Sequence, residues 1–78
     1  MAERDRILVK LFANLRDYGD REQEIDFELG MTPKEVVEMF KIPVDDVAIL
    51  MINGRRVKLD KELVKDDVLA IFPAVGGG

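Results

Sequence analysis

Residues 46–57 read D-V-A-I-L-M-I-N-G-R-R-V, and this stretch decides the fold of the chain. Its apolar run has hydrophobic side chains at successive positions, which is typical of a strand inside a sheet. Asn53 and Gly54 follow the run, and this pair favours the two-residue turn of a β-hairpin because both turn positions need positive φ. The stretch therefore predicts a hairpin in which residues 47–52 pair with residues 55–59, the latter as a short edge strand.

One helix is predicted ahead of the hairpin, in the segment G-M-T-P-K-E-V-V-E-M-F at residues 30–40. Thr32 occupies the N-cap position, Pro33 opens the first turn and Glu35 completes a capping box. We expect Met39 to fill the core from this helix, as a flexible apolar side chain. The other residues of the inward face, at helical spacing, are Val36, Val37 and Phe40.

Two strands are predicted before the helix. Residues 6–12, R-I-L-V-K-L-F, are rich in large and β-branched apolar side chains, as expected of a strand within a sheet. Residues 24–29, E-I-D-F-E-L, alternate between charged and apolar side chains, which indicates a half-buried strand antiparallel to the first. Its inward side chains are expected to be Ile25, Phe27 and Leu29.

The last strand is predicted at residues 68–72, V-L-A-I-F, and Pro73 ends it because proline cannot donate a ladder hydrogen bond. Residues 60–67 have room for one loose turn of helix around Leu63. The element order is then strand, strand, helix, strand, strand, strand. This order predicts an α+β fold, a ubiquitin-like β-grasp: a mixed sheet of about five strands with one main helix on one face.

A chain of 78 residues has material for one core, so a single domain is expected. We place the β-grasp domain at residues 1–73 and a flexible glycine-rich C-terminal tail at residues 74–78. The longest apolar run is far shorter than a membrane span, and the N-terminal residues lack the apolar stretch of a signal peptide. A cytoplasmic location is the resulting expectation.

The charge and residue inventory excludes several functions. Twelve Lys and Arg against sixteen Asp and Glu give a net charge of −4, so neither nucleic acid nor a membrane is expected as a partner. The chain has no serine, cysteine or histidine, so the usual catalytic triads and zinc sites cannot be built. The pairs Asp45-Asp46 and Asp66-Asp67 are read as turn residues, and no metal site is expected. A self-sufficient enzyme is therefore not predicted.

The strands carry more apolar side chains than one helix can cover. Residues 6–12, 47–52 and 68–72 are apolar on both faces, whereas a helix of two to three turns covers only one face of such a sheet. The uncovered face is a candidate docking surface, because monomers rarely expose large apolar patches. The alternative is that loops and the long stems of Lys and Arg side chains cover it.

The chain ends on F-P-A-V-G-G-G, at residues 72–78. The six residues after Phe72 extend over roughly 20 Å when fully stretched. The glycines present only backbone, so a narrow channel in another protein can admit the terminal carboxylate where a Cβ would clash. A globular body that delivers a reactive C-terminus explains both the apolar surplus and the tail.

The sequence resembles the ubiquitin-like MoaD/ThiS family of sulfur carriers, and within it the small subunits of molybdopterin synthase. The resemblance covers essentially the whole chain, through V-K-L-F-A-N-L-R-D-Y-G near the start, the hairpin M-I-N-G-R-R-V and above all the ending F-P-A-V-G-G-G. The usual ending of those subunits is closer to F-P-P-V-A-G-G. Ala74 thus replaces a proline and Gly76 an alanine, and both changes loosen the stalk.

The resemblance implies that the Gly78 carboxylate is adenylated, converted to a thiocarboxylate and used to donate sulfur to precursor Z, forming the dithiolene of molybdopterin. Gly77 provides clearance beside the reacting residue. The implied partners are the large synthase subunit, a ubiquitin-activating-type adenylating enzyme and a sulfur donor protein. The protein is then a non-catalytic subunit without a bound cofactor, and ATP is used by the activating enzyme. The residues implied to guide and anchor the tail in its partners are Phe72, Pro73, Val75 and Gly76.

Two other functions remain open from the sequence. One is a sulfur carrier for thiamine, tRNA thiolation or cysteine synthesis, which also covers a dual carrier and protein modifier. The other is a passive β-grasp interaction domain whose terminal glycines have no role.

Overall fold

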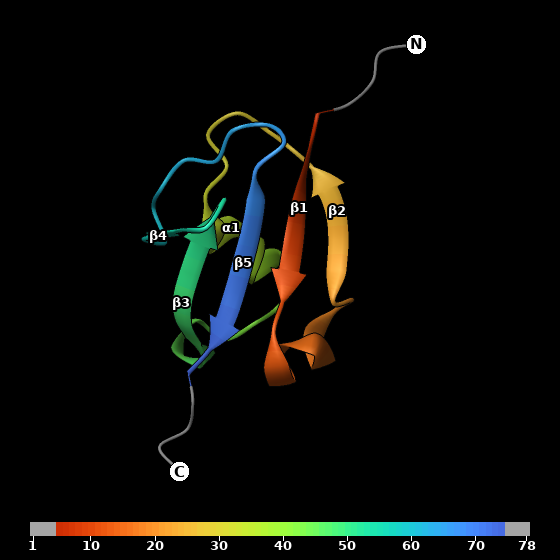
Figure 1. The fold of residues 1–78 in the computed structure, drawn as a ribbon, viewed down its shortest axis with the longest axis vertical. Helices are drawn as coiled ribbons and strands as arrows, with labels where there is room; N and C mark the ends of the chain where they lie inside the picture. The colour runs from red at the N-terminus through yellow and green to blue at the C-terminus, as the bar shows by residue number, and fades with distance from the viewer. Residues whose placement is uncertain (1–4, 75–78) are drawn as a thin grey trace.

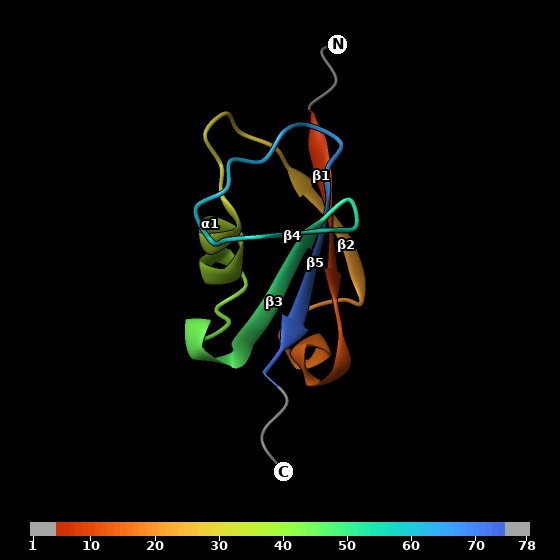
Figure 2. The same ribbon diagram turned by 60° about the vertical axis from the view of Figure 1, so that its left-hand side comes forward.

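A computed structural model describes residues 5–74 (Figure 1). Five strands form one sheet in the order β2-β1-β5-β3-β4, and α1 lies across one of its faces (Figures 1 and 2). The predicted β-grasp fold is confirmed. In chain order the elements are β1 (Arg6–Leu11), the 3-10 helix η1 (Ala13–Tyr18), β2 (Glu22–Asp26), α1 (Pro33–Met39), the 3-10 helix η2 (Val44–Asp46), β3 (Val47–Ile52), β4 (Arg55–Val57) and β5 (Val68–Pro73).

The last strand lies in the middle of the sheet. β5 pairs in parallel with β1, from Leu8 opposite Val68 to Leu11 opposite Ile71, and antiparallel with β3 on its other side. β2 pairs antiparallel with β1, as the sequence predicts, and β4 pairs antiparallel with β3 through the Asn53-Gly54 turn. Parallel neighbours need a long crossover, and here α1 with its loops provides part of it.

The helix α1 begins where the sequence predicts. The Thr32 hydroxyl oxygen accepts a hydrogen bond from the Glu35 N–H at 3.4 Å, and Pro33 occupies the first turn. The helix ends at a left-handed residue, Lys41 with φ 60°, rather than at a glycine. There the Lys41 N–H donates to the Glu38 carbonyl and the Ile42 N–H to the Val37 carbonyl, which is the pattern of a Schellman motif.

The hydrophobic core lies between α1 and one face of the sheet. Val9, Val36, Val37, Leu69 and Ile71 are fully shielded from solvent, and Ile42 enters the core directly after the Schellman turn. Side chains on alternate positions of β1 and β5 therefore point to the helix, as a period of two requires. The remaining members of the core are Ile7, Leu11, Leu15, Met31, Leu50, Ile52 and Leu63.

Three predictions from the sequence are wrong in detail. Leu29 is 94% exposed, because the ladder ends at Phe27 and the chain turns through a bond from the Met31 N–H to the Glu28 carbonyl. Met39 is 53% exposed at the end of α1, beside rather than on the buried face of the helix. Residues 60–67 form turns instead of a helical turn, although Leu63 is buried.

Asp67 links the hairpin to the start of β5. Asp67 is only 5% exposed, and its carboxylate accepts hydrogen bonds from the Asn53 amide at 2.9 Å and from the Val64 N–H at 2.8 Å. The Asn53 side-chain oxygen in turn accepts from the Val68 N–H at 2.9 Å. Asp67 is thus a turn residue, as predicted, but its side chain also fixes the register between two distant segments.

The edge strand β4 carries Arg55 and Arg56, both exposed, as predicted for a short edge that discourages pairing with another sheet. Within residues 5–74, no helix has the length and apolar character needed to cross a membrane.

We expect the replacement Asp67→Ala to lower the free energy of unfolding by about 2–3 kcal/mol, because it removes the acceptor of two part-buried hydrogen bonds, one from the Asn53 amide and one from the Val64 N–H. Urea unfolding followed by circular dichroism measures the change. Asp60→Ala, at an exposed position of the same loop, is the control and should cost less than about 0.5 kcal/mol. Equal effects of the two replacements would contradict a structural role for Asp67.

Candidate functional site

The C-terminal end of β5 is fixed from both sides, and it sets where the tail begins. On one side the Phe12 N–H donates to the Ile71 carbonyl at 3.2 Å. On the other side Pro73 lies opposite Val47, and the Ala74 N–H donates to the Asp46 carbonyl at 2.8 Å. The chain therefore leaves the sheet from its centre, at a defined position, immediately after Pro73.

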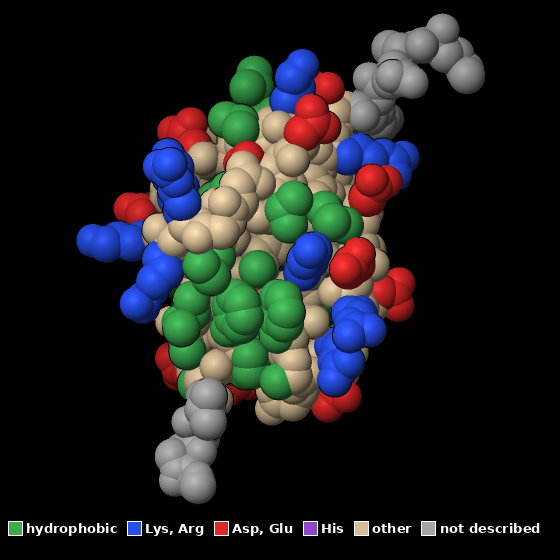
Figure 3. All heavy atoms as spheres, in the orientation of Figure 1, with side chains coloured by type: hydrophobic (Ala, Val, Ile, Leu, Met, Phe, Trp, Pro, Cys, Tyr) green, Lys and Arg blue, Asp and Glu red, His purple; other side chains and the backbone are tan. Residues whose placement is uncertain are grey.

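The face of the sheet opposite α1 has no helix over it in the described part of the chain (Figure 2). Hydrophobic side chains gather on this face over the lower parts of β1, β5 and β3, next to the end of β5 (Figure 3). Their positions follow from the strand registers, which place alternate residues away from the core. We call this surface the open face; its apolar residues are Leu8, Phe12, Ile49, Met51, Val68, Ala70 and Phe72.

Two aromatic rings join the open face to the root of the tail. Phe12 and Phe72 stack with ring centroids 4.4 Å apart and an interplanar angle of 9°. The contact arises because the parallel ladder pairs Leu11 with Ile71. The next residues along the two strands, Phe12 and Phe72, therefore lie side by side on the opposite face of the sheet. Phe12 remains 38% exposed. The stack thus holds the Phe72 ring beside the position where the tail begins, with apolar surface still available to a partner.

Long charged side chains cover the open face only in part. Lys10 lies between Leu8 and Phe12 on β1 and is half-buried, so its stem shields some of the apolar surface. Arg56 lies opposite Met51 at the border formed by β4, and Glu22 and Glu24 line the border formed by β2. The open face is therefore an apolar area with mixed charges around it, which is the composition of a docking surface.

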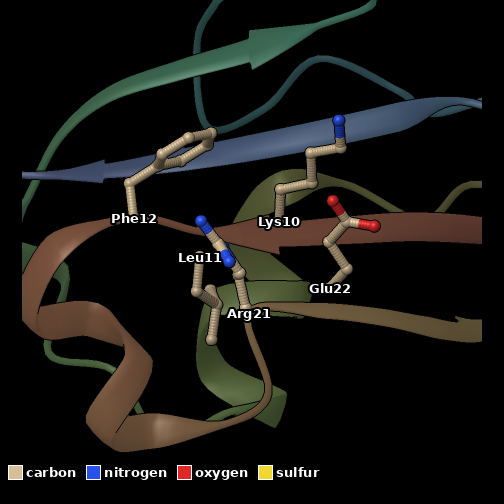
Figure 4. A pocket seen from close by; sticks show the side chains of 5 residues that line it. All are labelled: Lys10, Leu11, Phe12, Arg21 and Glu22. Carbon is tan, nitrogen blue, oxygen red and sulfur yellow. The ribbon is translucent and has the colours of Figure 1, made fainter.

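A shallow pocket of about 480 Å³ adjoins the Phe12 ring at the β2 side of the open face (Figure 4). Its lining includes two cationic side chains, Lys10 and Arg21, and one carboxylate, Glu22. In Figure 4 the Arg21 side chain extends from the residue just before β2 toward Leu11 and Phe12. The pocket can accept an acidic side chain of a docked protein, and its lining contains no serine, cysteine or histidine.

The residues predicted for the site divide into two groups. The structure places Phe72 and Pro73 together at the end of β5, where the open face meets the tail. The predicted guiding residues Val75 and Gly76, the clearance residue Gly77 and the reacting residue Gly78 lie outside the described residues. The same applies to the predicted flexibility of residues 75–78, whereas Ala74 at the start of that segment makes the bond to Asp46.

Sequence reasoning missed two contributors to this site. The sequence predicts a strand that includes Phe12 but no contact for its ring, and it predicts no role for Arg21. The parallel pairing of the first and last strands in a β-grasp was the available signal for Phe12, because it brings the two strand ends together. No sequence signal identified Arg21. Within residues 5–74, no three acidic side chains cluster in a way that could hold a metal ion.

The sheet order, the single helix and a C-terminal strand that leads from the sheet centre into a tail define a ubiquitin-like protein, with the fold of sulfur carriers and protein modifiers. Comparison of the sequence with known families narrows this class. Residues 9–78 match the ThiS family, and the chain belongs to that family. A search of curated protein sequences finds no match.

Solved structures share the fold over nearly the whole chain. A Pyrococcus furiosus protein provisionally named molybdopterin converting factor, subunit 1, is 30% identical with a TM-score of 0.74, covering 91% of this chain and 99% of that one. Small archaeal modifier protein 1 of Haloferax volcanii is 22% identical with a TM-score of 0.73 and the same coverage. Urm1 of Trypanosoma brucei is 12% identical with a TM-score of 0.71, covering 100% of both chains. The last two show the fold alone.

We expect the Phe12–Phe72 stack to give a favourable coupling energy of about 0.5–1.5 kcal/mol in a double-mutant cycle with Phe12→Ala and Phe72→Ala. The free energies of unfolding of the two single variants, the double variant and the parent protein measure it. A second cycle with Phe12→Ala and Phe27→Ala should be additive, because Phe27 packs against the core on the other face. Additivity in both cycles would contradict the stacking contact.

Proposed function

We propose that this protein is a sulfur carrier that serves as the small subunit of molybdopterin synthase, with Gly78 as the residue that bears the sulfur. The observation that carries the proposal is the position of the open face, which surrounds the root of the tail F-P-A-V-G-G-G. An apolar surface thus lies beside the point where the tail begins, and the sequence beyond that point ends on three glycines, as delivery of a C-terminal group requires.

The proposed chemistry takes place at the terminal carboxylate. A carboxylate oxygen of Gly78 attacks the α-phosphorus of ATP in the adenylating enzyme, and pyrophosphate leaves. Hydrosulfide sulfur from a donor protein then adds to the carbonyl carbon, the carbon–oxygen bond to AMP breaks, and a thiocarboxylate and a proton result. Sulfur in this anionic form is a nucleophile near neutral pH. No side chain of this protein acts as acid or base, which agrees with the absence of serine, cysteine and histidine from the sequence.

The open face has a specific task in this mechanism. Ordering six tail residues in a channel costs about 6–12 kcal/mol of conformational free energy, at ~1–2 kcal/mol per residue. Backbone hydrogen bonds recover only about 1 kcal/mol each. Docking of the open face supplies the missing affinity and raises the effective concentration of the tail over the partner's active site. The stacked Phe72 ring and the fixed Ala74 N–H aim the tail from a constant position.

Two observations support the molybdopterin branch of the family. The ending F-P-A-V-G-G-G resembles that of synthase small subunits, and the Pyrococcus furiosus protein of that provisional name is 30% identical along almost its entire length. Under this proposal the partners are the large synthase subunit, the adenylating enzyme and the sulfur donor. The thiocarboxylate donates its sulfur to precursor Z, and the free carboxylate of Gly78 is regenerated for the next cycle.

We expect protein isolated from its own cells without added thiols to contain a fraction in which sulfur replaces one oxygen at Gly78, detected by intact-mass and C-terminal peptide spectrometry. Removal of Gly77 and Gly78 should abolish this fraction and all molybdopterin formation by the reconstituted large subunit. The thermal unfolding midpoint should stay unchanged, because every strand and the helix remain in the chain.

Sulfur transfer to Gly78 without any molybdopterin formation, in the presence of the large subunit and precursor Z, would contradict the molybdopterin assignment and favour another sulfur carrier of the family. Failure of the adenylating enzyme to activate Gly78 would contradict the carrier function itself.

We expect Met51→Arg, in the middle of the open face, to lower kcat/KM for activation by the adenylating enzyme by about tenfold or more, because it places an unpaired charge in an apolar interface. Leu29→Arg is the matched control: it makes the same chemical change at a position that is 94% exposed and away from the open face. Equal activation of the two variants would contradict docking through the open face.

A further inference from the structure

The turn between β3 and β4 consists of Asn53 and Gly54, a pair that reacts with itself in an unrestrained chain. The Gly54 nitrogen attacks the side-chain carbonyl carbon of Asn53 and a carbon–nitrogen bond forms. The side-chain amide leaves as ammonia, which carries away the proton of the Gly54 N–H. Water then opens the resulting five-membered imide to aspartate or isoaspartate. Glycine favours this attack because it has no Cβ to crowd the approaching groups.

The turn is open to water, so nothing around it prevents the reaction by burial. Asn53 and Gly54 are both exposed and have φ angles of 52° and 84°. A Cβ placed on Gly54 would meet no atom within 4 Å, so no neighbouring segment packs over this residue. Any restraint on the reaction must therefore come from the contacts of the Asn53 side chain.

Three hydrogen bonds join Asn53 to the residues that open β5. Its backbone N–H donates to the Val68 carbonyl at 3.0 Å. Its side-chain oxygen accepts from the Val68 N–H at 2.9 Å, and its side-chain nitrogen donates to an Asp67 carboxylate oxygen at 2.9 Å. Both polar atoms of the amide are thus bonded, which fixes the plane of the group. Deamidation must break the bond to Asp67, because the nitrogen that donates it is the leaving group.

The acceptor of that bond is itself held in place. Asp67 is buried, and its second carboxylate oxygen accepts from the Val64 N–H at 2.8 Å. A hydrogen bond to an ionised carboxylate is stronger than one between neutral groups. The carboxylate therefore cannot follow the amide when the Asn53 side chain turns toward the Gly54 nitrogen.

We propose that Asn53 is a deamidation site that the folded protein restrains, with Asp67 and Val68 holding its side-chain amide in an unreactive orientation. The restraint lasts only while the start of β5 lies against the turn. Local opening of these bonds frees the amide, and attack by the Gly54 nitrogen followed by hydrolysis then converts it irreversibly. The modification thus records local opening at this end of β5.

The product destabilises the contact that restrained it. Aspartate at position 53 has a carboxylate oxygen where the amide nitrogen donated, so two like charges face each other across a former hydrogen bond of 2.9 Å. Isoaspartate also adds a backbone carbon to the turn, and the two-residue connection between β3 and β4 then no longer fits. Conversion therefore loosens the start of β5, the strand that leads into the tail.

The test follows deamidation of the full-length protein in heavy-oxygen water at mildly alkaline pH, by mass spectrometry of the fragment that contains residue 53. We expect the folded protein to convert at least about tenfold more slowly than the free peptide M-I-N-G-R-R, because misplaced reacting groups lose rate steeply. Asp67→Ala removes the acceptor and should raise the rate of the folded protein about fivefold or more.

Two further variants separate the local restraint from general stability. Val37→Ala removes buried methyl groups from α1, which also lowers stability, but it leaves every contact of Asn53 in place and should not change the rate. Asp67→Asn keeps the shape of the side chain and one acceptor oxygen, so it provides a folded variant if Asp67→Ala does not fold. Its rate should lie about twofold above that of the parent protein, because a neutral acceptor holds the amide less strongly.

The effect of the product is measured with Asn53→Asp, which makes the same chemical change without the reaction. We expect its thermal unfolding midpoint to fall by about 5 °C or more. Asn14→Asp is the matched control, since it makes the same replacement at an exposed position of η1 and should shift the midpoint by less than about 2 °C. Equal midpoints of the two variants would contradict the predicted effect on β5.

Three results would overturn the proposed restraint. These are conversion of the folded protein as fast as that of the peptide, an unchanged or slower rate in both Asp67 variants, and an acceleration by Val37→Ala equal to that by Asp67→Ala. The last would assign the reaction to fully unfolded molecules. None of these readouts involves Gly78 or an activating enzyme, so failure here leaves the sulfur-carrier proposal unaffected, and failure of that proposal leaves this one unaffected.

Discussion

The parallel pairing of β1 with β5 is the constraint on which the rest of the structure depends. It places the last strand between β1 and β3, where Leu69 and Ile71 are fully buried against the helix side. A C-terminal strand in the sheet centre cannot fray from an edge, so its end stays fixed. The same register brings Phe12 beside Phe72 and lets neighbouring segments hold Ala74. A tail attached at this point starts from a rigid base, which reduces the conformational freedom lost when a partner orders it.

The open face follows from the size of the helix. α1 has seven residues, enough to cover the core side of the central strands but nothing on the other face. In a protein that acts only as a monomer, the strand residues that point to this uncovered face would be polar, in alternation with the buried apolar residues. Here Met51 and Ala70 lie opposite each other on it, and Lys10 lies between the apolar side chains of Leu8 and Phe12. A surface of this kind is stable in water because each side chain is partly shielded by its neighbours, yet it gains free energy when a partner removes the remaining exposure.

Local chemistry made most of the fold predictable. The Thr32 capping box and the Asn53-Gly54 turn each act over a few residues, and the structure has both at the predicted positions. The errors arise where distant contacts decide. Alternation continues to Leu29 in the sequence, but the ladder stops beside Arg6, where β1 begins. The buried role of Asp67 depends on Asn53, 14 residues away, which no local pattern reveals. The position of Phe72 at the root of the tail was readable from the sequence, whereas its stacking partner, Phe12, required knowledge of which strands are neighbours.

Under the proposed function, one C-terminus is delivered to several proteins in turn and each of them must be released, so a single very tight docking surface would block the cycle. The open face meets the root of the tail at Phe72, so a partner that takes up the C-terminus also lies close to this face. Affinity is then divided between the face and the tail, and neither contact alone has to hold a partner tightly.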